Sequence, residues 1–184
     1  PVAERLPNQP LVLEPVEEVG TYGGTWRMVD YNDTLGWTRQ TIWIEPFVKF
    51  NRDLNGIRPN VLESWEWNDD ATGLTLNFRE GMKWSDGEPL TANDYLFWWN
   101  DMVLNENVPI EAPTWTRPGG EDMTVKKVDD YTVRLGFSEP NPLFREFAGR
   151  GHYNSAQQIV PAHYMKQFHP DYSDAENSDE LMKR

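Results

Sequence analysis

Residues 62–78 read LESWEWNDDATGLTLNF, and this stretch has the pattern of an antiparallel hairpin. The apolar residues of 74–78 alternate with polar ones, which is the period of a strand with one buried face. Trp65 and Trp67 share one face of the preceding strand, and the residues between the two strands favour a turn. The stretch therefore predicts two paired strands whose common face starts a core.

The sequence that follows predicts a helix from residue 92 to about residue 105. Thr91 can cap this helix, and Asp94 completes a capping box with Asp in place of Glu. Apolar residues recur at spacings of three and four, as on the buried side of a helix. Phe97 falls on the opposite side, so we expect a helix that is buried on two sides or that contacts a second lobe.

Further elements follow from the same patterns. The sequence predicts a strand at 25–29, a short helix and a strand within 38–50, a turn at 51–56, a long loop at 106–122, a second hairpin with strands in 125–128 and 131–137, a short helix at 143–148 and a last helix from about Pro161. Residues 1–19 are proline-rich without a regular period, and we expect an extended arm or linker. Hairpins with interspersed helices make an α/β fold of the mixed α+β kind.

Composition narrows the possible function classes. The chain has 184 residues with 30 acidic and 17 basic side chains, which gives a formal net charge of −13. That charge disfavours binding to nucleic acid or to an anionic membrane surface, because both need clustered Lys and Arg. The absence of cysteine excludes disulfides and thiolate metal sites, and no apolar run is long enough to span a membrane.

The sequence contains no motif for catalysis or for a cofactor. The three histidines lack the spacing of a metal site, and neither a phosphate-binding loop nor a nucleophile elbow is present. Glu80, Asp86 and Glu88 could be compared with the carboxylate pair of a glycosidase, but they surround turn glycines and are expected to be solvated. We therefore predict no enzymatic activity, no metal and no cofactor.

Nine tryptophans are an unusual number for a chain of this length. Those on the predicted strands and helix have the spacing of core residues. Trp37 and Trp115 differ because each lies in a loop with no apolar period. Loop aromatics are candidates for stacking on a ligand, and local packing is the alternative for both.

The stretch that joins the hairpin to the helix, residues 79–92, reads REGMKWSDGEPLTA. With the sequence ESW at 63–65, it resembles the signature of the family 5 extracellular solute-binding proteins, the oligopeptide- and dipeptide-binding proteins of ABC importers. Other stretches are similar to the family in the same order: GGTWR at 23–27, DDYTVR at 129–134, EPNPLF at 139–144 and IVP at 159–161. The resemblance covers about residues 20–170.

The resemblance implies a periplasmic-binding-protein-like class II fold, present in part. Residues 20–184 would be the N-terminal portion, with the start of the first lobe and the family's small extra domain, and with the second lobe missing. Members close two lobes around a solute and present it to a membrane permease. The implied partners are a small solute, an oligopeptide by default or an oligosaccharide, and the permease subunits of an ABC importer. The implied location is extracytoplasmic, with the membrane reached only through the permease or a lipid anchor.

The resemblance also suggests where a solute lies. The loop after the first strand resembles the family's cleft-facing segment, and a second candidate position precedes the return of the chain toward the hinge. Trp115 is added as an aromatic residue of a loop. The predicted ligand-binding residues are then Tyr31, Asn32, Asp33, Trp37, Trp115, Asn154 and Ser155. The signature itself is expected to be structural, because it supplies turn residues and the entry to the helix: Gly81, Asp86, Gly87, Pro89 and Thr91.

Two other function classes fit the sequence less well. A secreted carbohydrate-active enzyme or binding module would need a carboxylate pair at glycosidase separation or an exposed row of Trp side chains. A sensor domain that reuses the same fold would carry a fused DNA-binding or signalling segment, and these residues contain none.

Overall fold

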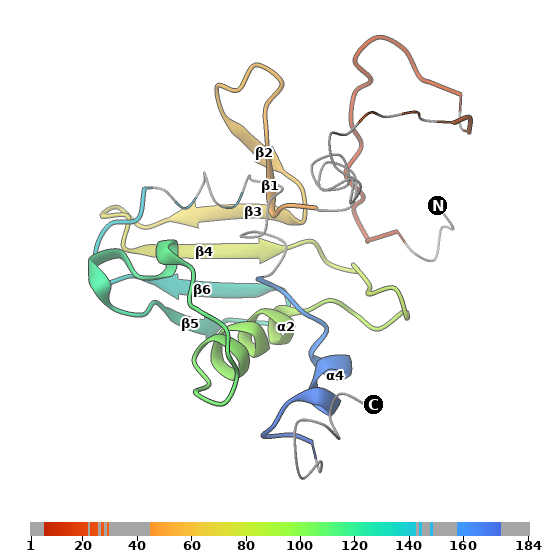
Figure 1. The fold of residues 1–184 in the computed structure, drawn as a ribbon. Helices are drawn as coiled ribbons and strands as arrows, with labels where there is room; N and C mark the ends of the chain where they lie inside the picture. Colours follow the sequence, from red (N-terminus) through yellow and green to blue (C-terminus); the bar gives the residue numbers. More distant parts are fainter. Residues whose placement is uncertain are drawn as a thin grey trace.

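The computed structural model describes residues 6–21, 23–25, 27, 29, 45–142, 144, 148 and 158–173. These residues form a mixed α/β structure with one four-stranded sheet, one small hairpin and several short helical segments (Figure 1). All strand pairs are antiparallel. The predicted fold class is confirmed.

The main sheet has the strand order β3-β4-β6-β5. Its strands are β3 (Leu62–Trp67), β4 (Gly73–Phe78), β5 (Thr124–Lys127) and β6 (Thr132–Gly136). Both predicted hairpins are confirmed, as β3–β4 and β5–β6. The register aligns Trp67, Leu74 and Leu135 across three strands, and the next row aligns Glu66, Thr75 and Arg134. Since successive residues point to opposite faces, the sheet has one apolar and one polar face.

A separate small hairpin outside the main sheet consists of β1 (Val48–Phe50) and β2 (Ile57–Pro59). It projects beyond β3 at the edge of the main sheet (Figure 1). The turn predicted at 51–56 joins its two strands, and the strand predicted within 38–50 is β1. The short strand β2 was not predicted, because three residues are too few to display an alternating pattern.

The predicted central helix is confirmed in position but not in its hydrogen bonding. It begins as α2 (Ala92–Leu96) and continues as the π-helix η2 (Phe97–Val103). The Leu104 N–H donates to the Trp99 carbonyl, five residues back, at 3.0 Å. This wider turn carries three consecutive large aromatic side chains that are all buried: Phe97, Trp98 and Trp99.

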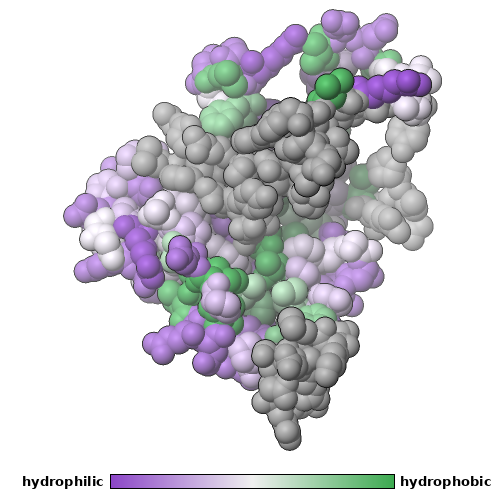
Figure 2. All heavy atoms as spheres, viewed as in Figure 1, coloured by the Kyte–Doolittle hydropathy of each residue, from purple (hydrophilic) through white to green (hydrophobic). Residues whose placement is uncertain are grey.

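The core lies between the apolar face of the sheet and the α2–η2 helix. One cluster joins side chains of the two layers: Leu62, Leu74, Leu76, Phe78, Val133, Leu135, Tyr95, Trp98 and Trp99. The Trp99 indole N–H donates to the Met123 carbonyl at 3.1 Å, so a ring inside this core has its polar group satisfied. In Figure 2, hydrophobic residues are visible in the lower half of the face drawn, with hydrophilic residues beside them.

Four short segments complete the described structure. They are η3 (Thr114–Thr116) and η4 (Pro118–Gly120), both inside the predicted long loop, and then α4 (Ala162–Met165) and η5 (Lys166–Phe168). Pro161 is the N-cap residue of α4, so the predicted last helix is confirmed. Phe144 and Ala148 are helical, and the rest of the helix predicted at 143–148 lies outside the described residues.

The strand predicted at 25–29 is not found at its described positions. Thr25, Arg27 and Val29 have no regular secondary structure, and residues 26 and 28 lie outside the described part. Val29 is 97% exposed, and no described strand pairs with this stretch. An alternating pattern alone therefore did not predict a strand correctly, because a strand also needs a hydrogen-bonding partner. The helix predicted after residue 38 also lies outside the described residues, up to residue 44.

Residues 6–19, the described part of the predicted arm, contain no helix or strand, and neither do residues 20 and 21. Two hydrogen bonds attach this segment to the end of β4. The Asn8 N–H donates to the Glu80 carbonyl at 3.0 Å, and Arg79 Nη1 donates to the Gln9 carbonyl at 2.8 Å. Within the described residues, no helix is long and apolar enough to cross a membrane.

Candidate functional site

Six of the seven predicted ligand-binding residues lie outside the described structure: Tyr31, Asn32, Asp33, Trp37, Asn154 and Ser155. Their assignment to the ligand site stays a prediction. The structure does describe the chain further along from each of these two segments, from residue 45 and from residue 158. The contacts of these described residues show which elements lie next to the chain that leads out of each segment.

Trp115 is the one predicted residue whose position is described, and it lies on η3. Its side chain is 4% exposed. The indole stacks on Trp98 with an interplanar angle of 11° and a centroid distance of 6.4 Å, and its edge contacts Phe144 at 5.6 Å. Asn141 Nδ2 also donates to the Trp115 carbonyl at 2.7 Å. Local packing, one of the two alternatives for Trp115, is therefore observed. A contact of Trp115 with a ligand stays a prediction.

The segment after residues 31–37 returns to the core at Phe47. Its ring is 1% exposed and lies 5.9 Å from the ring of Phe78 and 6.0 Å from that of Tyr95. Tyr95 belongs to α2 and is fully buried, which raises the pKa of its hydroxyl. The chain beyond residues 31–37, whose description resumes at residue 45, therefore packs against α2 through Phe47.

The segment after residues 154–155 returns to the same place. Gln158 is 1% exposed, and the two apolar residues that follow it pack against the core. The Ala162 N–H then donates to Oδ1 of Asp94 at 2.9 Å. Asp94 and Tyr95 are neighbours on α2, so Ala162 and Phe47 contact adjacent residues of one helix.

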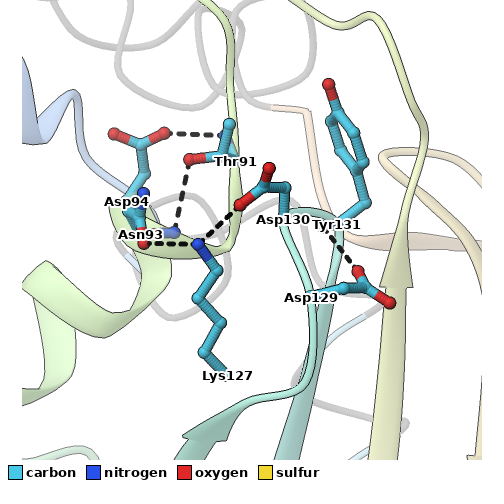
Figure 3. A network of polar contacts seen from close by, with 7 residues as sticks. All are labelled: Thr91, Asn93, Asp94, Lys127, Asp129, Asp130 and Tyr131. Carbon is cyan, nitrogen blue, oxygen red and sulfur yellow. Dashed lines mark hydrogen bonds and ion pairs between the residues drawn. The ribbon is translucent and has the colours of Figure 1, made fainter.

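Figure 3 shows the capping box at the start of α2, which includes Asp94. Thr91 Oγ1 accepts the Asn93 N–H at 3.3 Å, and Asp94 Oδ2 accepts the Thr91 N–H at 2.8 Å. Lys127 Nζ bridges Asn93 Oδ1 at 3.0 Å and Asp130 Oδ1 at 2.6 Å, which connects the β5–β6 hairpin to the helix. The predicted capping box is confirmed, and it joins the sheet, the helix and α4.

The rest of the signature sets turns, as predicted. Gly81 and Gly87 have φ values of +83° and +100°, which L side chains rarely adopt. Asp86 Oδ1 accepts the Glu88 N–H at 3.2 Å, and Asp86 Oδ2 lies 2.7 Å from His163 Nε2 on α4. The hydrogen bond with His163, and then that with the Glu88 amide, lower the pKa of Asp86. The predicted solvation of the Glu80, Asp86 and Glu88 side chains is confirmed, since all three residues are exposed.

The second side of the π-helix is covered by residues 166–173. The Phe97 ring lies 5.6 Å from His169 and 6.1 Å from Tyr172, and Phe97 is 3% exposed. Of the two expectations for Phe97, burial on two sides within this chain is the one observed. Tyr172 donates from its hydroxyl to Asp101 Oδ1 at 2.5 Å, and this hydrogen bond raises the pKa of Tyr172.

His169 has a structural role in the same segment. Its Nε2 lies 2.6 Å from the Asp101 carbonyl, which can only accept, while its Nδ1 accepts the Asp171 N–H at 3.1 Å. These contacts fit the tautomer whose hydrogen is on Nε2. Among the described residues, no group of three or more His, Asp or Glu side chains could hold a metal ion.

Residues 56–181 match the family model described as "Bacterial extracellular solute-binding proteins, family 5 Middle". The match covers more than half of the chain and includes the β3–β4 and β5–β6 hairpins, the capped helix and α4. The chain therefore belongs to the family 5 extracellular solute-binding proteins.

Comparisons with individual proteins agree with this assignment. The periplasmic alpha-galactoside-binding protein of Rhizobium meliloti (strain 1021) is 35% identical over 195 aligned residues, which cover 94% of this chain and 27% of the relative. A solved structure of an oligopeptide-binding protein OppA has a TM-score of 0.78 at 35% identity, over 100% of this chain and 28% of that one. The periplasmic binding protein MelB of Agrobacterium fabrum C58, in complex with stachyose, has a TM-score of 0.60 at 32% identity, over 75% of this chain and 21% of that one.

The chain thus spans between a fifth and a third of the length of these relatives. All three are named as binding proteins, and the ligands in their names are an alpha-galactoside, an oligopeptide and stachyose. The capping box of Thr91 and Asp94 was predicted from the sequence, but the hydrogen bond of Asp94 with Ala162 was not. The only sequence signal for that second hydrogen bond is an acidic residue at the third helical position, which a capping box without such a bond also has.

Proposed function

We propose that this chain is part of the substrate-binding component of an ABC importer, which captures a solute outside the cytoplasm and delivers it to a membrane permease. The structural observation that supports this is that Phe47 and Ala162, which follow the two predicted site segments in the chain, contact the adjacent residues Tyr95 and Asp94 of α2. A binding protein needs ligand-contacting segments that start from a rigid support, because ordering them on binding costs free energy.

The first candidate solute is an oligopeptide. It is supported by the OppA structure, whose similarity extends over the full length of this chain. Residues 20–184 would then supply the N-terminal part of the binding protein, and a second lobe would supply the rest of the cleft. Because half of the contacts would be absent, this part alone would bind solute weakly or not at all.

The second candidate solute is an oligosaccharide. It is supported by the alpha-galactoside-binding relative, which aligns with 94% of this chain, and by the stachyose complex of MelB. The large number of tryptophans adds no support, because the six described ones are buried or half-buried in the core: Trp65, Trp67, Trp84, Trp98, Trp99 and Trp115. Sugar stacking would therefore fall to residues such as Trp37.

The expected partners are the permease subunits, and contact with the membrane would come only through them or a lipid anchor. The protein would act in the periplasm or at the cell surface. The relatives are binding proteins, which supports a role without catalysis.

The experiment is calorimetric titration of the full-length protein with a mixed oligopeptide library and, separately, with stachyose. Binding should be lost in Trp37→Ala or Asn32→Ala, whereas the exposed Leu54→Ala on the β1–β2 turn serves as a matched control. If the wild type binds stachyose and the site variants do not, the solute is an oligosaccharide. If the wild type binds the peptides and the site variants do not, the solute is an oligopeptide. Binding that is unchanged in both site variants would contradict the proposed site.

A further inference from the structure

The N-terminal arm carries apolar side chains that no other part of the described structure covers. Residues 11–19 read LVLEPVEEV, and five of these nine residues are Leu or Val. All nine are exposed, with Val12 at 84% and Val19 at 87%. Single apolar residues are common on a protein surface, but a continuous run of them is typical of a surface that contacts another body.

The base of the arm is fixed to the folded core at the end of β4. The Asn8 N–H donates to the Glu80 carbonyl at 3.0 Å. The Gln9 carbonyl accepts from Nη1 of Arg79, whose side chain is buried. Beyond these contacts, no backbone hydrogen bond joins residues 11–20 to another described residue, and in Figure 1 this segment, in red, runs outside the layers of the sheet and the helix. The apolar run therefore starts from a rigid support, which lowers the entropy cost of ordering it against a partner.

The composition of residues 11–19 does not suit a linker that stays in water. Flexible linkers are rich in Gly, Ser and charged residues, which lose little by remaining solvated. In this segment the only charged residues are Glu14, Glu17 and Glu18, and they lie between apolar ones. A segment of this composition is stabilised when its Leu and Val side chains leave water.

Charge and length decide between the possible partners of the arm. A second copy of this chain is disfavoured, because each copy has a formal net charge of −13 and residues 11–19 contain no basic side chain. The same charge disfavours an anionic membrane surface. The chain spans 27% of the alpha-galactoside-binding relative and 28% of the OppA structure, so a protein of that length has most of its residues outside this chain.

We infer that residues 11–19 pack into an apolar groove on the part of the full-length protein that follows residue 184. The three carboxylates of the segment favour a groove with Lys or Arg side chains at its rim. The arm thereby attaches the described domain to the remainder of the protein, whether or not solute is bound. The inference rests on the proposed function only in that the full-length protein contains the rest of a binding protein.

The first test is a photo-cross-link in the full-length protein without solute, so that its outcome does not depend on which solute binds. Val12 is replaced by the photoreactive residue p-benzoylphenylalanine, and the peptides joined on illumination are identified by mass spectrometry. We expect cross-links within one polypeptide to residues beyond 184. Amide hydrogen exchange of residues 11–20 should also be at least about tenfold slower than in an unstructured peptide of the same sequence.

A pair of variants links this protection to the apolar side chains. Val16→Asp places a charge in the contact and should accelerate exchange of residues 11–20 at least about tenfold. Leu54→Asp makes the same kind of change at another exposed apolar residue, on the β1–β2 turn, and should leave that exchange unchanged. Covalent dimers, or exchange of residues 11–20 at the rate of the unstructured peptide, would overturn the inference. A protected arm in a protein that binds neither peptides nor stachyose would support it while contradicting the proposed function.

Discussion

The carboxylate of Asp94 is hydrogen-bonded to the backbone N–H of Ala162, 68 residues further along the chain, at 2.9 Å. Its other oxygen accepts the N–H of Thr91 at 2.8 Å. One 4% exposed side chain therefore satisfies free N–H groups at the start of α2 and at the start of α4. This contact attaches the start of α4 to the start of α2.

Replacing Asp94 should destabilise the fold more than an ordinary helix cap does. Asp94→Ala removes two acceptors and leaves two N–H groups without a partner, so the free energy of unfolding should fall by about 2 kcal/mol. Asp94→Asn keeps one acceptor oxygen and should cost about half as much. Urea unfolding followed by circular dichroism measures both, with the exposed Asp69→Ala as control. A loss in Asp94→Ala no larger than that in the control would contradict the double cap.

The contact of Asp86 with His163 should make stability depend on pH in the acid range. The pKa of Asp86 is lower in the folded than in the unfolded protein, chiefly because of the hydrogen bond with His163. Such a group stabilises the fold above its unfolded pKa, and this contribution is lost as the pH falls through the folded pKa. The difference in unfolding temperature between the wild type and Asp86→Asn should therefore shrink below about pH 4. Parallel curves from pH 6 to pH 2 would show that the contact has no such effect.

Removing Phe97 should release the segment that covers the π-helix. Phe97→Ala deletes a buried ring that contacts His169 and Tyr172, and the loss should be about 3 kcal/mol. Amide hydrogen exchange should increase in residues 166–173 more than in β4. Leu54→Ala, at a side chain that is 76% exposed, should change neither quantity. Uniform acceleration across the sheet, without a larger effect in 166–173, would argue against a separate attachment of this segment.

The attachment of the N-terminal arm can be tested at a glycine. A Cβ at Gly81 would lie 2.8 Å from Asn8 Oδ1 and 2.9 Å from Asn8 N, whereas a Cβ at Gly87 would meet nothing within 4 Å. Both have positive φ, so either substitution by Ala costs about 1 kcal/mol from the backbone alone. Only Gly81→Ala should also detach residues 6–10 and increase their cleavage in limited proteolysis. Equal cleavage in the two variants would mean that the arm does not depend on this contact.

Much of the described fold could be predicted from sequence because its elements carry their own local signals. The alternation in 74–78, the turn residues between the strands and the capping box at Thr91 are all short-range patterns. The strand expected at 25–29 shows the limit of such patterns, since Val29 alternates correctly but has no described partner. The change from α to π hydrogen bonding after Leu96 was missed as well, because no local signal distinguishes the two in three consecutive aromatics.

The candidate site was less predictable, for the same physical reason. Trp115 lies in a loop without an apolar period, yet its ring stacks on Trp98, 17 positions before it in sequence. Loop aromatics with core partners and loop aromatics with ligand partners look alike in sequence, because the partner is remote in both cases. The hydrogen bond between Asp94 and Ala162 also joins residues that are far apart in sequence. Only the other hydrogen bond of Asp94, in the capping box, has a local sequence pattern.

The function proposed for the protein to which this chain belongs is the capture of an oligopeptide or an oligosaccharide for import. The most direct measurement is the unfolding temperature of the full-length protein with an oligopeptide library and with stachyose. A ligand at 100 times its dissociation constant adds about 2.7 kcal/mol of stability, so one of the two should raise the unfolding temperature clearly. The increase should disappear in Trp37→Ala. A well-folded protein whose unfolding temperature responds to neither ligand would contradict the account.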